Sequence, residues 1–256
     1  IAADQLVLHY QPKATLSDGR TEAIETLVRW QHPVHGLLYP DRFLPLAEQT
    51  DVIDALTDWV LRHALIETQK LGPIGEDLAV AVNISGRNLA RSDFASRVRA
   101  VLDELGVAPA RLIIEITETA LVADPARAAT MLGELAAAGV QVSLDDFGCG
   151  QTSLGYLSAL PLHELKIDKS FVMDMLVNHT HASIVRSIVD LGHNLGLRVV
   201  GEGVETERIL QTLGATGCDV AQGYFLARPM PAVNLRDWLI ASRVAGAPSP
   251  TFADQF

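Results

Sequence analysis

The chain has 256 residues, 48% of them hydrophobic, and a formal net charge of −11. This length suits a single α/β barrel of roughly 250 residues, and the apolar content argues against a disordered chain. The excess of acidic residues argues against binding to DNA or RNA polymers, because such binding depends on Lys and Arg neutralising phosphates.

Short strand-like runs alternate with amphipathic, helix-like stretches along most of the chain. The expected strands are residues 6–16, 22–30, 78–85, 112–117, 140–145, 162–168, 197–201 and 219–225. The expected helices include residues 53–70, 93–105, 127–138, 181–195 and 208–213. Helix-capping residues support this assignment, because Asp124-Pro125 is typical of an N-cap followed by a first-turn proline, and Gly139 is typical of the glycine that ends a helix.

Eight strands alternating with helices predict either a closed, mostly parallel barrel or a doubly wound open sheet. The short turn at residues 17–20 reads as a hairpin, which makes the first strand antiparallel to its neighbour. We predict an α/β fold, a modified TIM-type (βα)8 barrel with this antiparallel first strand. Residues 1–244 are expected to form one domain, and residues 245–256 a disordered C-terminal tail.

Polar residues lie within or directly after most of the expected strands. Because a barrel brings the carboxyl ends of its parallel strands to one mouth, these residues would converge there. Each one alone could be an ordinary polar strand end. Glu115 is harder to explain in that way, since isoleucines flank it and a buried, unpaired carboxylate costs several kcal/mol. In chain order the polar residues are Glu25, Asn83, Glu115, Asp145, Asp146, Lys166, Glu202 and Gln222.

Carboxylates that converge repel one another unless divalent cations lie between them. Oxygen ligands without a histidine cluster favour Mg²⁺ or Mn²⁺ over a structural zinc. Asp145 and Asp146 precede a glycine-rich exit from their strand, where the chain can turn and present both side chains. One of them could then bridge two cations while the other binds only the second, and Lys166 could orient the attacking water or neutralise charge.

The motifs of the chain match a known family in type and order. Glu25-Thr26-Leu27 continues as Val28-Arg29-Trp30-Gln31-His32-Pro33. The other matching segments are Tyr10-Gln11-Pro12, Phe43 with Pro45 and Ala47-Glu48, Val82-Asn83-Ile84-Ser85, Glu115-Ile116-Thr117-Glu118, Asp145-Asp146-Phe147-Gly148, Leu165-Lys166-Ile167-Asp168, Gly201-Glu202-Gly203-Val204-Glu205 and Gln222-Gly223-Tyr224. Over nearly its whole length the chain resembles the EAL-type cyclic di-GMP phosphodiesterases, although Thr26 replaces the alanine of the family's name.

The resemblance implies a two-metal enzyme that hydrolyses cyclic di-GMP to linear pGpG with Mg²⁺ or Mn²⁺. It implies a first metal held by Glu25, Asn83, Glu115 and Asp145, and a second held by Asp145 and Asp146. It implies catalytic roles for Glu25, for Lys166 as the lysine that holds the hydrolytic water, and for Glu202 as base or water ligand. It also implies substrate-binding or supporting roles for Gln11, Arg29, Glu205 and Gln222, and a loop-stabilising role for Glu118.

The loop after Phe147 departs from the usual family pattern at Cys149 and Gln151, which bears on loop packing and dimer geometry. Cys149 is either a redox-sensitive thiol near the metals or a small residue in a small space. Two other functions stay open: a receptor that binds cyclic di-GMP without turnover, and an unrelated barrel metalloenzyme acting on a sugar or carboxylate.

The cellular setting is inferred from the cysteine content, the hydropathy and the resemblance. The two cysteines indicate a reducing compartment, and no run approaches ~20 unbroken apolar residues, so no membrane segment is expected. We therefore expect a cytoplasmic protein, or the cytoplasmic part of a larger membrane-attached one. The resemblance further implies a homodimer and a sensory or diguanylate cyclase-like domain in the full-length protein.

Overall fold

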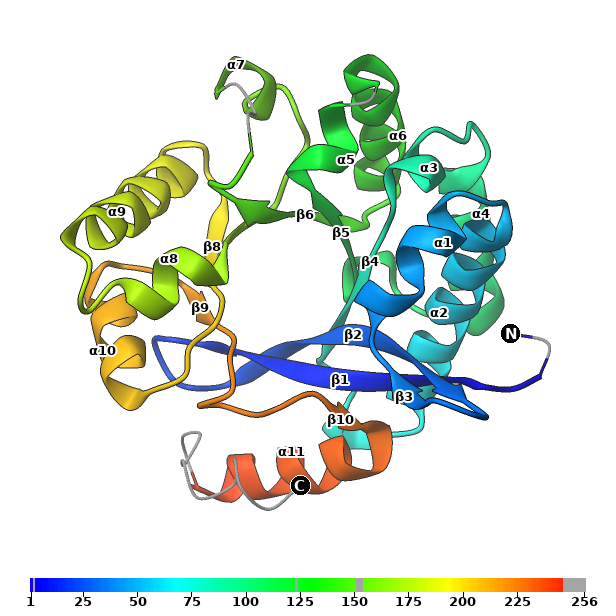
Figure 1. The fold of residues 1–256 in the computed structure, drawn as a ribbon, viewed down its shortest axis with the longest axis horizontal. Coiled ribbons are helices and arrows are strands. Elements are labelled where there is room, and N and C mark those ends of the chain that lie inside the picture. Colours follow the sequence, from blue (N-terminus) through cyan, green and yellow to red (C-terminus); the bar gives the residue numbers. More distant parts are fainter. Residues whose placement is uncertain (2, 123, 151–153, 246–256) are drawn as a thin grey trace.

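A computed structural model of the chain describes residues 1, 3–122, 124–150 and 154–245 (Figure 1). Eight strands of the described residues form a barrel whose order is β1, β2, β4, β5, β6, β7, β8 and β9, with β9 pairing again with β1. Two short strands, β3 and β10, extend this sheet along β2 and β1. The strands are β1 Leu6–Thr15, β2 Thr21–His32, β3 Gly36–Leu38, β4 Ala79–Asn83, β5 Leu112–Thr117, β6 Gln141–Phe147, β7 Glu164–Ile167, β8 Arg198–Gly201, β9 Val220–Ala221 and β10 Met230–Pro231.

Helices surround the barrel on its outer side (Figure 1). The α-helices are α1 Leu44–Glu48, α2 Val52–Gln69, α3 Gly86–Leu89, α4 Phe94–Leu105, α5 Glu118–Val122, α6 Pro125–Ala137, α7 Leu154–Leu157, α8 Lys169–Asp174, α9 His179–Asn194, α10 Glu207–Ala215 and α11 Ala232–Ala245. Three 3₁₀ turns lie at Pro40–Arg42 (η1), Gly72–Ile74 (η2) and Pro109–Arg111 (η3). In the part of the chain that the structure describes, none of the helices has both the length and the apolar content to cross a membrane.

The predicted modified barrel is confirmed. β1 runs antiparallel to both of its barrel neighbours, β2 and β9, whereas the remaining neighbours in the barrel are parallel. Because β1 closes the sheet on both sides, the doubly wound open sheet is excluded. The cap signals of α6 are also confirmed: the Asp124 side chain accepts a hydrogen bond from Arg127 N, and Gly139 follows the helix with a φ of 90°.

The eighth barrel strand is much shorter than the predicted run 219–225. After Ala221 the chain leaves the ladder and runs against Val204, whose N–H donates to the Gln222 carbonyl at 3.0 Å. The approach is so close that a Cβ on Gly223 would lie 2.2 Å from the backbone nitrogen of Val204. This backbone contact, which hydropathy cannot reveal, ends the strand. Helix α11, which packs beside β1 and β10, is likewise absent from the sequence-based assignment.

The two faces of the strands have different environments. Outward-facing residues such as Ile114, Ile116 and Leu144 are fully buried beneath the helices in the main hydrophobic core. Inside the barrel, a small separate cluster of Ala23, Ala81 and Ile113 fills only the lower part. Since successive side chains on a strand point to opposite faces, the isoleucines beside Glu115 pack outward while Glu115 itself points into the barrel. The interior above the small cluster is therefore left to polar groups.

Candidate metal centre and active site

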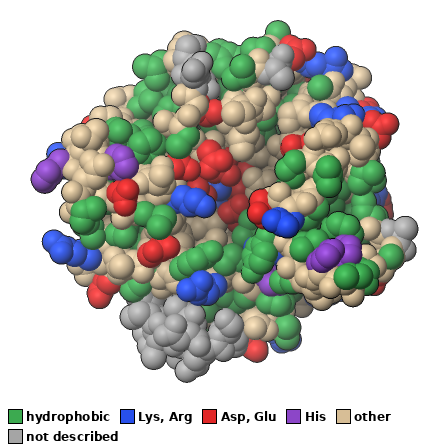
Figure 2. All heavy atoms as spheres, in the orientation of Figure 1, with side chains coloured by type: hydrophobic (Ala, Val, Ile, Leu, Met, Phe, Trp, Pro, Cys, Tyr) green, Lys and Arg blue, Asp and Glu red, His purple; other side chains and the backbone are tan. Residues whose placement is uncertain are grey.

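Inward-facing polar residues of the barrel strands meet near the carboxyl ends of the parallel strands. In the strand register, Glu25 of β2 lies opposite Gln11 of β1, and Asn83 of β4 lies beside Glu115 of β5. Acidic side chains gather near the middle of the face shown in Figure 2, inside the ring of helices. The strand alternation thus places a ring of carboxylates at the mouth of the barrel.

Within the part of the chain that the structure describes, two groups of three carboxylates have the spacing of metal ligands. Glu25, Glu115 and Asp145 form one group, and Asp145, Asp146 and Glu202 form the other, with one potential ligand atom per residue lying within 4.8 Å of the others in its group. Asp145 belongs to both groups. A shared carboxylate of this kind can bridge two cations, and Asn83 adds an amide beside the first group, where its Nδ2 donates to Glu25 Oε1 at 2.8 Å. These hard oxygen donors suit Mg²⁺, Mn²⁺ or Ca²⁺.

The backbone at the end of β6 brings Asp145 and Asp146 to the same side. Asp146 has a φ of 55°, in the left-handed region that non-glycine residues rarely adopt, and its N–H donates to Asp145 Oδ1 at 2.9 Å. The pairing of β6 with β7 shifts register between Leu144 and Phe147. A bulge of this kind re-aims side chains at a strand end. Without this bulge, the consecutive residues Asp145 and Asp146 would point to opposite faces of the sheet.

Lys166 is the fully buried cation at the centre of the acidic cluster. Burial lowers the pKa of this ammonium, but the surrounding carboxylates overcome that effect and raise the pKa well above its ordinary value. The side chain is therefore a charged donor. Its Nζ lies 2.7 Å from Glu202 Oε1, 3.1 Å from Asp145 Oδ1, 3.3 Å from Glu115 Oε2 and 3.7 Å from Glu25 Oε2.

Three carboxylates of the cluster hold their protons more tightly than free carboxylates do. Burial, opposed by Lys166, raises the pKa of Glu202 to about 8. Burial also raises the pKa of Glu25. At Asp146, desolvation followed by repulsion from Asp145 raises the pKa to about 6, although the side chain is exposed at the mouth. These shifts arise first from burial and then from neighbouring carboxylates, and bound divalent cations would oppose both effects by favouring the ionised forms.

The residues that the resemblance assigns to substrate are arranged in different ways. Gln11 and Gln222 are buried and hydrogen-bonded to each other, and Gln222 Nε2 also donates to Glu25 Oε2 at 2.5 Å. Gln222 therefore orients Glu25, and Gln11 in turn helps to hold Gln222. Arg29 lies four residues after Glu25 on β2, with its guanidinium 4.8 Å from the centroid of the Tyr39 ring and its buried Nε without a hydrogen-bond partner. Glu205 is exposed on the loop between β8 and α10.

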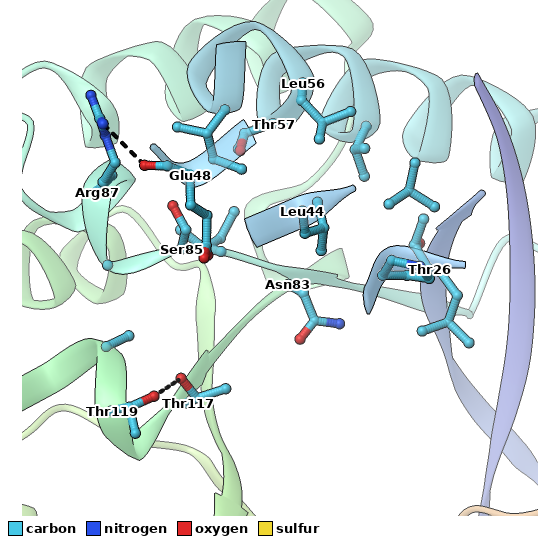
Figure 3. A pocket seen from close by; sticks show the side chains of 18 of the residues that line it. Thr26, Leu44, Glu48, Leu56, Thr57, Asn83, Ser85, Arg87, Thr117 and Thr119 are labelled. Carbon is cyan, nitrogen blue, oxygen red and sulfur yellow. Dashed lines mark hydrogen bonds between the residues drawn. The ribbon is translucent and has the colours of Figure 1, made fainter. Parts of the chain in front are cut away.

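A cavity of about 680 Å³ adjoins the acidic cluster at Asn83 (Figure 3). Leu27, Leu44 and Leu56 give it largely apolar walls, and the Asn83 side chain from β4 points into the space beside them. A ligand in this cavity would have its apolar surface buried and one end beside the carboxylates. The cavity therefore suits the ring system of a ligand whose charged part lies over the acidic cluster.

Glu118 lies beneath the loop that follows β6. Its side chain is buried, and Oε1 accepts a hydrogen bond from Gly148 N at 2.9 Å. A Cβ on Gly150 would lie 2.1 Å from Glu118 Oε2, so the loop can pack this closely only with glycine there. Cys149 is exposed, and desolvation together with a hydrogen bond to Asp168 raises the pKa of its thiol. Gln151, the other departure from the family pattern, lies outside the described residues.

A second polar layer lies deeper in the barrel and is absent from the sequence-based site. Lys13, which is fully buried, donates to Glu115 Oε1 at 2.6 Å and to Glu164 Oε1 at 2.9 Å. Glu164 Oε1 also accepts from Ser143 Oγ at 2.9 Å. The two-residue period of a strand could have predicted these inward-facing residues. Lys13, Ser143 and Glu164 each lie two positions from a residue at the mouth of the barrel, namely Gln11, Asp145 and Lys166.

Comparison with known proteins identifies the family. The profile of the EAL domain matches residues 1–229. The chain is 44% identical over 246 residues to the cyclic di-GMP phosphodiesterase NbdA of Pseudomonas aeruginosa, covering 96% of this chain and 31% of that protein. It is 43% identical over 232 residues to the bifunctional diguanylate cyclase/cyclic di-GMP phosphodiesterase MucR of the same species, covering 90% and 34%. The chain thus spans about a third of the length of these curated relatives.

The fold comparison agrees with the sequence comparison. The solved PaMucR phosphodiesterase in complex with c-di-GMP superimposes with a TM-score of 0.86 at 42% identity, covering 91% of this chain and 95% of that one. These matches exclude the alternative of an unrelated barrel metalloenzyme, and they confirm the resemblance seen in the sequence motifs. The chain belongs to the EAL domain family.

Proposed function

We propose that this domain is a phosphodiesterase that hydrolyses cyclic di-GMP to linear pGpG with the help of two divalent cations. The observation that carries the proposal is that the two groups of three carboxylates share Asp145, and that the charged Lys166 lies between these groups. Relatives named cyclic di-GMP phosphodiesterases support the substrate.

The charge balance of the barrel interior supports two divalent cations. Six carboxylates lie in or at the edge of the two polar layers, and the cations that form ion pairs with them among the described residues are Lys13 and Lys166. Four negative charges remain when all six are ionised, as many as two divalent cations neutralise. The six carboxylates are those of Glu25, Glu115, Asp145, Asp146, Glu164 and Glu202.

We assign the first cation to Glu25, Asn83, Glu115 and Asp145, and the second to Asp145 and Asp146. The Asn83 amide nitrogen is used on Glu25, which leaves its oxygen for a cation. Mg²⁺ or Mn²⁺ fits this set, because the donors are oxygens. When bound, such cations lower the pKa of water and neutralise the charge that builds on the phosphate oxygens during displacement.

The side chains around the proposed cations would position and activate the attacking water. Lys166 donates toward the point where Glu25, Asp145 and Glu202 meet, so it would hold the water by a hydrogen bond. Glu202 contacts Lys166 through Oε1, which leaves Oε2 to accept the proton of that water. A carboxylate whose pKa lies near the working pH is suited to this role, and burial moves the pKa of Glu202 in that direction.

Substrate binding would use groups on two sides of the cluster. We propose that a guanine base enters the cavity beside Asn83, where apolar walls bury the ring. The unpaired Nε of the buried Arg29 would serve an anionic or carbonyl oxygen of the nucleotide. Gln11 and Gln222 would act through Glu25, while the exposed Glu205 has a supporting role.

The domain would act as part of a larger assembly. We propose residues 1–244 as the phosphodiesterase unit and a homodimer as its working form, since Val122 at the end of α5 and Leu154 at the start of α7 expose large apolar side chains. MucR is named as bifunctional, which supports a diguanylate cyclase-like domain as the partner in the full-length protein, with a sensory domain as the other candidate. We propose a cytoplasmic location for this unit because its two cysteines are free thiols, as expected in a reducing compartment.

The test is a turnover assay with the purified chain, cyclic di-GMP and either Mg²⁺ or Mn²⁺, with pGpG followed by chromatography. We expect pGpG to form, to disappear with a chelator and to fall by at least ~10² in the Asp146→Asn variant, which keeps the shape but removes a charge from the proposed site. Binding of cyclic di-GMP to the parent protein without formation of pGpG in either Mg²⁺ or Mn²⁺ would contradict the proposal and favour a receptor.

A further inference from the structure

Lys13 is the deepest cation of the barrel and has no part in the mechanism described above. It lies on β1 two residues beyond Gln11, on the same inward face of the strand. Its ammonium is fully buried and is held on one side by Glu115 and on the other by Glu164. Glu164 is anchored in turn by Ser143. A continuous row of hydrogen bonds therefore runs from the wall of the lower barrel to Glu115.

The two oxygens of Glu115 face different partners. Oε1 points down and accepts from Lys13 at 2.6 Å, whereas Oε2 accepts from Lys166 at the longer distance of 3.3 Å. Lys166 also contacts Asp145, so Oε2 is the oxygen on the side of the acidic cluster. The stronger bond holds Oε1 away from that cluster.

We propose that Lys13 is a positioning residue that restricts Glu115 to a single ligand oxygen and thereby sets the metal selectivity of the site. This inference rests on the proposed function, because it requires that Glu115 bind a cation. With Oε1 held below, Glu115 offers only Oε2 to a cation at the mouth.

The number of oxygens that a carboxylate offers distinguishes cations of different size. Mg²⁺ demands near-ideal octahedral geometry, whereas Ca²⁺ accepts six to eight oxygens and often takes a carboxylate through both of them. A Glu115 that is fixed through one oxygen therefore favours Mg²⁺. When Lys13 is removed, Oε1 is free to rotate toward the cluster, since Glu115 then keeps only the longer bond to Lys166, which three other carboxylates share.

The alternative role for Lys13 is neutralisation of Glu164 as part of the folded core. Two variants separate these roles. Lys13→Met removes both interactions, while Glu164→Gln keeps the Lys13 bond to Glu115 and removes only the lower charge. The double variant Lys13→Met/Glu164→Gln removes the lysine without leaving a buried, unpaired carboxylate at 164, and so protects the test against a variant that fails to fold.

The measurement is metal competition in the absence of substrate. Mn²⁺ bound to the protein is followed by its electron paramagnetic resonance signal and displaced by Mg²⁺ or by Ca²⁺. The ratio of the two displacement midpoints gives the selectivity, and the loss of one positive charge cancels from this ratio because both ions carry the same charge. Lys70→Met, the same substitution at an exposed lysine at the end of α2, is the matched control.

We expect the selectivity for Mg²⁺ over Ca²⁺ to fall about tenfold in Lys13→Met and in the double variant, the low end of the range for residues that support metal ligands. Glu164→Gln and Lys70→Met should keep the parent ratio. A parent ratio in the double variant, or an equal fall in Glu164→Gln, would overturn the inference while leaving the phosphodiesterase proposal intact. Absence of Mn²⁺ binding to the parent protein would overturn both.

Discussion

The contact between Gly150 and Glu118 makes a sharp prediction about the loop after β6. In Gly150→Ala the new Cβ would lie 2.1 Å from Glu118 Oε2, 2.8 Å from Cδ and 3.0 Å from Cβ of the same side chain. Rotation of the carboxylate alone cannot relieve a contact that extends to the Cβ. Either the loop or the whole Glu118 side chain must move, and the hydrogen bond to Gly148 N is lost in both cases.

The size of the effect follows from that hydrogen bond. A hydrogen bond to a charged group contributes about 1.5–3 kcal/mol. If Asp146 can bind the second cation only while Gly148 N is bonded to Glu118, losing that bond lowers the fraction of molecules able to bind the cation by the same free energy. This corresponds to a fall in rate of about 10- to 150-fold. Asp146 lies only two residues before Gly148, so little backbone is available to absorb the displacement.

The assay is kcat for pGpG formation at saturating substrate over a range of Mn²⁺ concentrations, together with the melting temperature. We expect Gly150→Ala to need more Mn²⁺ and to have a lower kcat at nearly the parent melting temperature. Gly133→Ala is the control, because a Cβ there meets no atom within 4 Å and alanine favours the surrounding helix α6. Parent kinetics in Gly150→Ala would refute the coupling between Glu118, the loop and the second cation.

Three other predictions follow from the charges of the site. The folded-state pKa of Glu202 is raised from 4.5 to about 8, so its contribution to stability is present at low pH and is lost as the pH rises toward 8. Because the ionised carboxylate then favours a bound cation, added Mg²⁺ should raise the melting temperature more at pH 8 than at pH 6. An equal rise at both pH values would contradict this prediction. Lys166→Met should lower kcat by at least ~10² and leave Mn²⁺ binding detectable, whereas loss of Mn²⁺ binding would assign the lysine a role in holding the cations rather than the water. The raised pKa of Cys149 keeps it as a thiol at neutral pH, so parent and Cys149→Ser should lose activity to peroxide at the same rate, and protection by the serine would restore the redox hypothesis.

The fold was predictable because the strand and helix periods are strong in this chain. The hairpin at residues 17–20 fixes the direction of β1, and the helix caps at Asp124 and Gly139 fix α6. The early end of β9 was not predictable, since it results from the backbone packing of Gly223 on Val204, two segments that hydropathy treats separately. Helix α11 directly follows β10, a strand of only two residues that is too short to give a periodic signal in the sequence.

The site residues at the mouth of the barrel could be predicted from the sequence, whereas those deeper in the barrel were harder to predict. The carboxylates at the mouth could be inferred from their places at strand ends, and the geometry that turns Asp146 toward Asp145 agrees with the glycine that follows two residues later. Lys13 lies inside β1 and Glu164 at the start of β7, away from the mouth, where a charged residue reads as exposed unless its partner is known. Each is buried because the other neutralises it, and that pairing spans 151 positions of the sequence.

The reversed direction of β1 has a consequence for how the domain could be controlled. In the parallel strands the acidic face lies at the end of each strand, but in β1 it lies at the beginning, since Leu6 pairs with Trp30 at the end of β2. A polypeptide joined ahead of this strand would therefore enter on the face that carries the chemistry. Tension or rotation in such a leader would act along the strand that bears Gln11 and Lys13. It would reach Glu115 directly through Lys13, and Glu25 through Gln222, which bonds both Gln11 and Glu25.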